Sequence, residues 1–84
     1  MTMENKGSTP SVGILAAKLI EAIDNLTAKI STENEVIEII KTIISDKKKR
    51  LKILDGNNAK SKFAALMGKS RLEKFYLLLD KAEN

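Results

Sequence analysis

Apolar residues recur at helical spacing through most of this chain. Between residues 10 and 30 the steps alternate between four and three, which indicates a narrow apolar stripe along one face of a helix. The stripe consists of Val12, Ala16, Leu19, Ile23, Leu26 and Ile30. Thr9 precedes Pro10, and proline is favoured at a first helical position because it needs no N–H there. The pattern predicts a helix over residues 10–30.

The same spacing continues over residues 33–54, after a two-residue link. Thr32 and Glu35 match the capping-box pattern, in which a hydroxyl and a carboxylate satisfy free backbone donors at a helix start. The apolar positions are Val36, Ile37, Ile40, Ile43, Ile44, Leu51 and Leu54. Isoleucine also suits strands, but the three-four spacing favours a helix. Because the link is short, we expect the two helices to form an antiparallel hairpin.

Lys47 interrupts the apolar stripe of this second helix. The antiparallel register places it opposite Ala16, in the middle of the face expected to be buried. Two interpretations stay open. The lysine stem lies over Ala16 and Ala17 while its ammonium reaches water, or the helix bends near Ser45 and Asp46.

Two shorter helices are predicted over residues 59–67 and 71–82. Asp55-Gly56-Asn57 is expected to end the second helix, with Gly56 as the residue just past the helix end. Asn58 is the expected N-cap of the third helix, Gly68 its end, and Ser70 with Glu73 a second capping box. The apolar positions are Phe63, Ala64, Leu66 and Met67, then Leu72, Phe75, Tyr76, Leu79 and Ala82.

No segment shows a strand pattern, so the predicted fold class is all-α, a small helical bundle. Residues 1–8 are polar and without periodicity, and we expect a flexible tail there. Residues 9–84 are expected to form a single domain, because 84 residues are enough for one.

The composition argues against catalysis. The chain contains no Cys and no His, so disulfides, thiol chemistry and the usual neutral-pH general base are excluded. Carboxylates, lysines and Tyr76 remain, and they form no recognisable catalytic pair. We therefore expect no enzyme activity, no cofactor and no metal. No apolar run reaches the roughly 18 residues of a membrane span, and we expect a cytoplasmic protein.

Charge is strongly segregated along the chain. Ten of its 15 Lys and Arg residues lie between Lys47 and Lys74, against only two acids, Asp55 and Glu73, which gives that window a formal +8 in a chain of net +4. Such a window predicts a polyanionic partner, DNA or RNA. The candidate binding residues are Lys48, Lys49, Arg50, Lys52, Lys60, Lys62, Lys69, Ser70, Arg71 and Lys74.

The two halves of the basic window differ in what they imply. Residues 47–52 end the second predicted helix, where cations complement the helix dipole, so a purely structural role accounts for them as well as binding does. Lys60, Lys62, Arg71 and Lys74 lie at predicted helix starts, where cations oppose the dipole unless an anion is shared. The favoured phosphate contact is therefore the start of the last helix, at Lys69, Ser70, Arg71 and Lys74.

Neither of two nucleotide or DNA motifs is well supported. Gly68-Lys69-Ser70 resembles the end of a P-loop, but Phe63 occupies the position that requires the first glycine. A helix-turn-helix centred on Gly68 is one residue out of phase, since Lys74 rather than Phe75 falls on the inward position. We expect Phe63, Phe75 and Tyr76 to pack in the core rather than stack on bases.

A protein-interaction module is the alternative function, such as a small inhibitor, chaperone, antitoxin or assembly factor. Its basic window would meet an acidic protein surface, or its first helix would meet a second copy. Ile14, Leu15 and Ile20 form an additional apolar edge on that helix, beyond what one hairpin partner needs. We therefore expect a homo-oligomer, with a dimer favoured. Membrane binding is not expected, because no Trp or Phe accompanies the lysine run.

Overall fold

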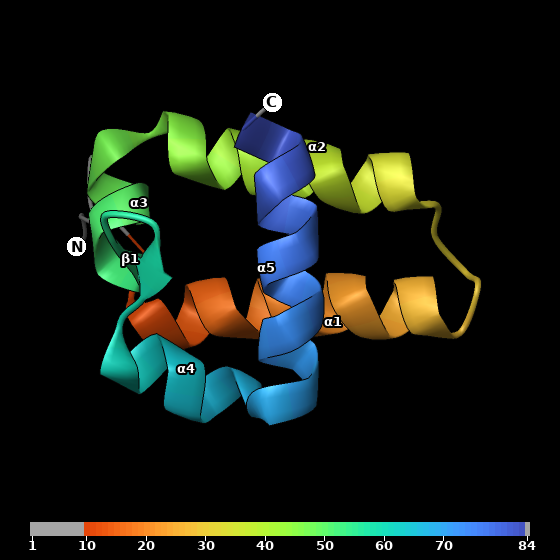
Figure 1. Cartoon of the computed structure of the whole chain (residues 1–84), viewed down its shortest axis with the longest axis horizontal. Helices are drawn as coiled ribbons and strands as arrows, with labels where there is room; N and C mark the ends of the chain where they lie inside the picture. The colour runs from red at the N-terminus through yellow and green to blue at the C-terminus, as the bar shows by residue number, and fades with distance from the viewer. Residues whose placement is uncertain (1–9, 84) are drawn as a thin grey trace, which may run out of the picture.

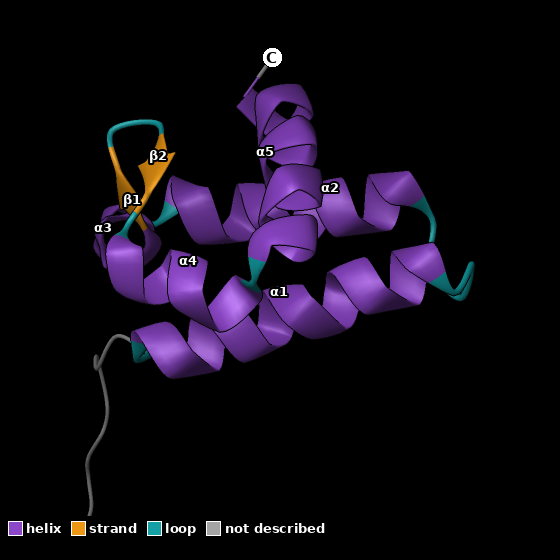
Figure 2. Cartoon of the chain, turned by 60° about the horizontal axis from the view of Figure 1, so that its bottom comes forward, coloured by secondary structure: helices purple, strands orange, loops and turns teal. Residues whose placement is uncertain are grey.

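The computed structural model describes residues 10–83 and has the predicted all-α class. The expected tail at residues 1–8, and Thr9 with it, lies outside the described residues. Within residues 10–83, five helices surround one core, and two very short strands form a hairpin between the third and fourth helices (Figures 1 and 2). The elements in chain order are α1 (Val12–Thr27), α2 (Glu33–Ser45), α3 (Lys47–Ile53), β1 (Leu54–Asp55), β2 (Asn58–Ala59), α4 (Ser61–Met67) and α5 (Lys69–Glu83).

Helices α1 and α2 form the predicted antiparallel hairpin, and α5 crosses both of them on one side (Figure 1). Helix α4 packs along α1, and α3 closes the end of the hairpin at which α2 terminates. This arrangement puts the C-terminal helix in contact with segments from every other part of the bundle.

Helix α1 is shorter at both ends than the predicted 10–30. It begins at Val12, two residues later than predicted, because Ser11 provides the N-cap, its hydroxyl accepting from the Ile14 N–H at 3.3 Å. It ends at Thr27. Ile30, expected on the buried stripe, is 74% exposed.

The end of α1 is a Schellman motif built without glycine. Lys29 has φ 64°, the left-handed conformation that normally favours glycine. The Ile30 N–H donates to the Asn25 carbonyl at 2.8 Å, and the Lys29 N–H to that of Leu26 at 3.0 Å. No glycine or proline signals this stop in the sequence, which is why the predicted helix ran three residues too far.

The capping box at the start of α2 is confirmed. The Thr32 hydroxyl accepts from the Glu35 N–H at 3.2 Å, and the Glu35 carboxylate accepts from the Thr32 N–H at 2.8 Å. Two orphan donors are thereby satisfied, which fixes where the chain leaves the hairpin loop.

The second predicted helix, 33–54, is two helices that break at Asp46. This residue has extended backbone angles (φ −90°, ψ 111°), and its carboxylate caps α3 by accepting from the N–H groups of Lys48 and Lys49 at 3.0 and 3.3 Å. Of the two interpretations of Lys47, the bend is therefore correct, and Lys47 is exposed. The break also turns Leu51 outward, 52% exposed, and buries Ile53 in its place.

A two-residue hairpin loop follows α3, where the sequence predicted a helix stop and no strand. Leu54 pairs with Ala59 and Asp55 with Asn58, so Asn58 lies in a strand and does not cap α4. Gly56, first of the two loop residues, has φ 65°. Positive φ at that position suits the right-handed twist of a hairpin, and glycine adopts it without steric cost.

Gly68 ends α4 as predicted and forms a sharp corner with α5. Its backbone angles, φ 82° and ψ 161°, belong to a region almost restricted to glycine. Helix α5 starts immediately afterwards at Lys69, two residues earlier than expected, so the predicted Ser70–Glu73 capping box does not form. Helix α4 starts at Ser61 rather than residue 59, with Lys60 at its N-cap position.

The core is entirely apolar among the described residues. Phe63 and Phe75 meet edge to face with ring centroids 5.2 Å apart, as expected for core aromatics. Tyr76 lies at the margin instead, 37% exposed, and its hydroxyl accepts from the Ala59 N–H at 2.9 Å. The buried side chains are those of Leu15, Ala16, Leu19, Ala22, Ile23, Val36, Ile40, Ile43, Ile53, Leu54, Phe63, Met67, Phe75, Leu78, Leu79 and Ala82.

Candidate nucleic-acid interface

The outer face of α3 is basic. At about 100° per residue, Lys48 and Lys52 lie one above the other, with Lys47 and Leu51 beside them, while Ile53 points to the core on the other side. All three lysines are exposed. The helix break at Asp46 therefore creates a short, separately oriented platform for the lysine run.

The break also changes where the lysine run lies relative to the helix dipole. Lys47, Lys48 and Lys49 form the first turn of α3, not the last turns of a long helix. Cations at a helix start oppose the dipole, so the expected structural explanation fails for these three. It still applies to Arg50 and Lys52, which lie in the last turn of α3.

Arg50 and Lys49 differ from the other residues of the run. Arg50 Nη2 lies 2.9 Å from the Glu83 carboxylate, and both side chains are about 30% exposed. This ion pair ties α3 to the end of α5. Lys49 is half-buried and lines a groove between α1 and α2. Of these predicted binding residues, Arg50 is therefore engaged in an ion pair and Lys49 is half-buried, whereas Lys48 and Lys52 are exposed to solvent.

The hairpin brings Lys60 and Lys62 to the same end of the molecule as α3. The Lys60 N–H donates to the Ile53 carbonyl at 2.8 Å, which places Lys60 beside the residue that follows Lys52. Lys62 follows in the first turn of α4. We call this set the basic end: Lys47, Lys48, Lys52, Lys60 and Lys62. Among residues 10–83, none of the five forms an ion pair.

The start of α5, predicted as the main phosphate contact, is a separate cluster. Lys69, Ser70, Arg71 and Lys74 line one shallow pocket of about 360 Å³, together with residues of α1. Helix α4 separates this cluster from the basic end, and its seven residues span about 10 Å at roughly 1.5 Å each.

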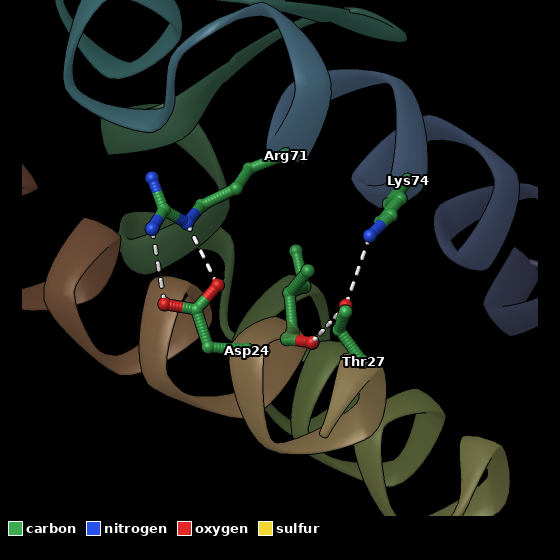
Figure 3. A network of polar contacts seen from close by, with 5 residues as sticks. Asp24, Thr27, Arg71 and Lys74 are labelled. Atoms are coloured by element: carbon green, nitrogen blue, oxygen red, sulfur yellow. Dashed lines mark hydrogen bonds and ion pairs between the residues drawn. The ribbon is translucent and has the colours of Figure 1, made fainter. Parts of the chain in front are cut away.

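Two of these four residues already have protein partners (Figure 3). Arg71 Nε and Nη2 lie 2.9 and 3.0 Å from the two oxygens of Asp24, and Lys74 Nζ donates to the Thr27 hydroxyl at 2.9 Å. The hydrogen bond from Arg71 lowers the pKa of Asp24, and Asp24 in turn raises the pKa of Arg71. Arg71 and Lys74 therefore hold α5 on α1.

The remaining donors of this cluster point elsewhere. The N–H groups of Lys69, Ser70 and Arg71 find no acceptor among residues 10–83, because Gly68 precedes them and offers no capping side chain. Lys69 is exposed and forms no ion pair with a described residue. The local features that suggested an anion site are present, but fewer side chains remain available for it than the sequence indicated.

Sequence reasoning missed the partners that fix this geometry. Asp24 and Thr27 lie 47 residues before the side chains they bind, and no local pattern connects them. Core packing is the favoured prediction for Tyr76, with its hydroxyl free to stay at the surface; the hydroxyl does lie there, and it joins α5 to the hairpin.

The described residues offer little else that is chemically distinctive. Residues 10–83 contain no group of three or more Asp and Glu side chains arranged to hold a metal ion. No helix within that range is long and apolar enough to cross a membrane.

Comparison with known proteins returned no family model, no curated protein and no solved structure that matches this chain.

Proposed function

We propose that this protein is a non-enzymatic regulatory protein that binds nucleic acid through its basic end. The observation that carries the proposal is the set of five exposed lysines on α3, the hairpin junction and the start of α4, none paired with a described carboxylate. Asp46 and Asp55 are the only acids in that stretch of the chain, and Asp46 is engaged as the cap of α3.

The chemistry of these residues favours the phosphate backbone over the bases. Lysine is a flexible point charge that positions a protein on phosphates without reading sequence. The chain has two arginines, Arg50 and Arg71, and both are paired with carboxylates. We therefore expect weak base specificity. Five neutralised phosphates correspond to a log–log salt slope of about −4.5 on duplex DNA.

Lys69 is proposed as an outlying contact to the same backbone. A phosphate oxygen beside it would accept from the free N–H groups at the start of α5, in the field of the helix dipole. Arg71 and Lys74 then act by fixing the orientation of α5 rather than by touching the ligand.

Charge reversal tests the proposal with a matched control. Lys48→Glu with Lys52→Glu, and Lys29→Glu with Lys41→Glu, both lower the net charge of +4 to zero. Fluorescence anisotropy with a random duplex, a single-stranded DNA and an RNA measures affinity across a salt series. We expect the first variant to lose at least about tenfold in affinity and to reduce the slope by about 2. Equal losses in both variants would mean that only overall charge matters, and wild-type binding that is independent of salt would refute the proposal.

An acidic protein surface is the second candidate partner, favoured by one observation. Leu51 is 52% exposed in the middle of the lysines of α3, and an apolar side chain adds affinity for a protein but nothing for phosphates. Leu51→Ser separates the two: nucleic-acid affinity stays within about twofold if the ligand is the backbone, because every lysine remains.

A further inference from the structure

A shallow groove of about 330 Å³ lies between α1 and α2. Helices α4 and α5 contribute none of its lining, so they leave this part of the hairpin uncovered. The lining side chains used below are Ile14, Lys18, Glu21, Ala22, Asn25 and Ile39.

Two isoleucines that line this groove are exposed to solvent. Ile14 is 58% exposed on α1, and Ile39 is 38% exposed on α2. The predicted apolar edge of α1 is therefore only partly available, since Leu15 is buried and Ile20 packs against the core. Lys18 and Glu21 follow Ile14 by one and two turns along α1, and among residues 10–83 neither forms an ion pair.

We propose that this face binds a second copy of the same chain, with the two α1 helices antiparallel about a two-fold axis. A symmetric interface requires a surface that complements itself. If the axis passes midway between residues 18 and 21, each Lys18 ammonium faces Glu21 of the second copy. Two ion pairs then form from charges that have no described partner in the monomer.

The same axis brings the exposed isoleucines together. It places Ile14 opposite Asn25 of the second copy. Residues equally distant from the α1–α2 loop lie across from each other in the hairpin, so Ile39 lies across from Glu21, about one helical turn from the level of Asn25, and both Ile39 and Asn25 line the groove. Each Ile14 thus enters the partner's groove about one helical turn from Ile39, and the contact occurs twice.

The size of the face sets the strength of the dimer. The face is about 24 Å long, which is the length of the 16-residue helix α1, and about 20 Å wide, which is the width of α1 and α2 side by side. Such a patch falls short of the roughly 800 Å² per partner of a standard stable interface. We therefore expect a weak dimer that forms in the micromolar to millimolar range.

A charge swap tests the pairing without relying on loss of folding. Lys18→Glu alone places two carboxylates at each proposed ion pair, and Glu21→Lys alone places two ammonium groups there. An equimolar mixture restores both pairs, because the carboxylate introduced at position 18 then meets the ammonium introduced at position 21. Sedimentation equilibrium near 150 mM salt, without nucleic acid, is the measurement.

Wild-type protein should rise from 9.3 kDa towards twice that mass as concentration increases to about 1 mM. Each single variant should dimerise at least about tenfold more weakly, and the mixture should recover wild-type association. A wild-type chain that stays monomeric, or a dimer that both variants leave unchanged, would overturn the proposal. None of the five lysines of the basic end lines this groove, so failure here and failure of nucleic-acid binding are separate results.

Discussion

Arg71 binds the carboxylate of Asp24 through two hydrogen bonds, with Nε 2.9 Å from Oδ1 and Nη2 3.0 Å from Oδ2. This planar contact joins the first turn of α5 to the last turns of α1 (Figure 3). The contact fixes how α5 crosses the hairpin. Because the contact lies at the surface, its specificity comes from the geometry of the paired hydrogen bonds rather than from burial.

The Asp24–Arg71 contact makes stability depend on pH in the acid range. Because the pKa of Asp24 is lowered in the folded state, the ionised carboxylate stabilises the fold above its unfolded pKa of about 3.9. That contribution disappears as pH falls through the lower folded-state pKa. We expect Asp24→Asn to be less stable than wild type at pH 7, and the difference to disappear as pH falls through the lowered pKa of Asp24, as measured by urea unfolding across pH.

Glu38→Gln is the matched control for this experiment. Its partner Lys41 lies 3.7 Å away on the same helix, and both side chains are well exposed, so this pair contributes little. If Glu38→Gln reproduced the loss seen with Asp24→Asn, the effect would reflect overall charge rather than the contact between α1 and α5.

Loss of the Asp46 carboxylate should destabilise α3. Its oxygen caps two N–H groups of a seven-residue helix, so Asp46→Ala should cost about 1 kcal/mol in urea unfolding. Asp46→Ser, which keeps a capping oxygen, should cost only a few tenths. A neutral result for Asp46→Ala would mean that α3 is held by Ile53 and the hairpin alone.

Gly68 should tolerate no side chain, for reasons of backbone conformation. No atom lies within 4 Å of an added Cβ, yet φ 82° with ψ 161° is strained for any other residue. Gly68→Ala should therefore cost about 1–3 kcal/mol. Gly13→Ala is the control of opposite sign: Gly13 lies in the first turn of α1, where alanine fits without strain and should stabilise by about 0.4–1 kcal/mol. Thermal unfolding of both variants checks the prediction.

Removing the Tyr76 hydroxyl should loosen the hairpin. The Ala59 N–H donates to it at 2.9 Å, so Tyr76→Phe should cost about 0.5–1.5 kcal/mol. Hydrogen exchange locates the effect, since the Ala59 amide should exchange faster while the Phe75 amide in the middle of α5 should not. Equal acceleration at both amides would indicate global destabilisation instead.

Much of this fold follows from local patterns. The Thr32–Glu35 capping box, the two apolar stripes and the short link between them lead directly to the α1–α2 hairpin, because each signal acts within one or two helical turns. The break at Asp46 was harder to recognise, since Ser45-Asp46 resembles an ordinary polar step in a helix. Lys47 on the apolar stripe was the one sign of it.

The candidate site was less predictable than the fold. Charge segregation located the basic residues, but which lysines remain free depends on partners far away in the sequence. The crossing angle of α5 over α1 decides that Arg71 meets Asp24 and Lys74 meets Thr27. No periodicity encodes that angle, so the sequence does not reveal that two of the four residues predicted for phosphate contact, Arg71 and Lys74, also bind α1.

The contacts of α5 have a consequence for how the basic end is assembled. Arg50 on α3 is held by Glu83, and Ala59 in the hairpin is held by Tyr76, so both anchors come from the last helix of the chain. None of the five lysines lies in that helix. A chain cut before Tyr76 would keep every one of these charges and lose the support that orients them, and any ligand that requires their arrangement would be released without the removal of a single contact residue.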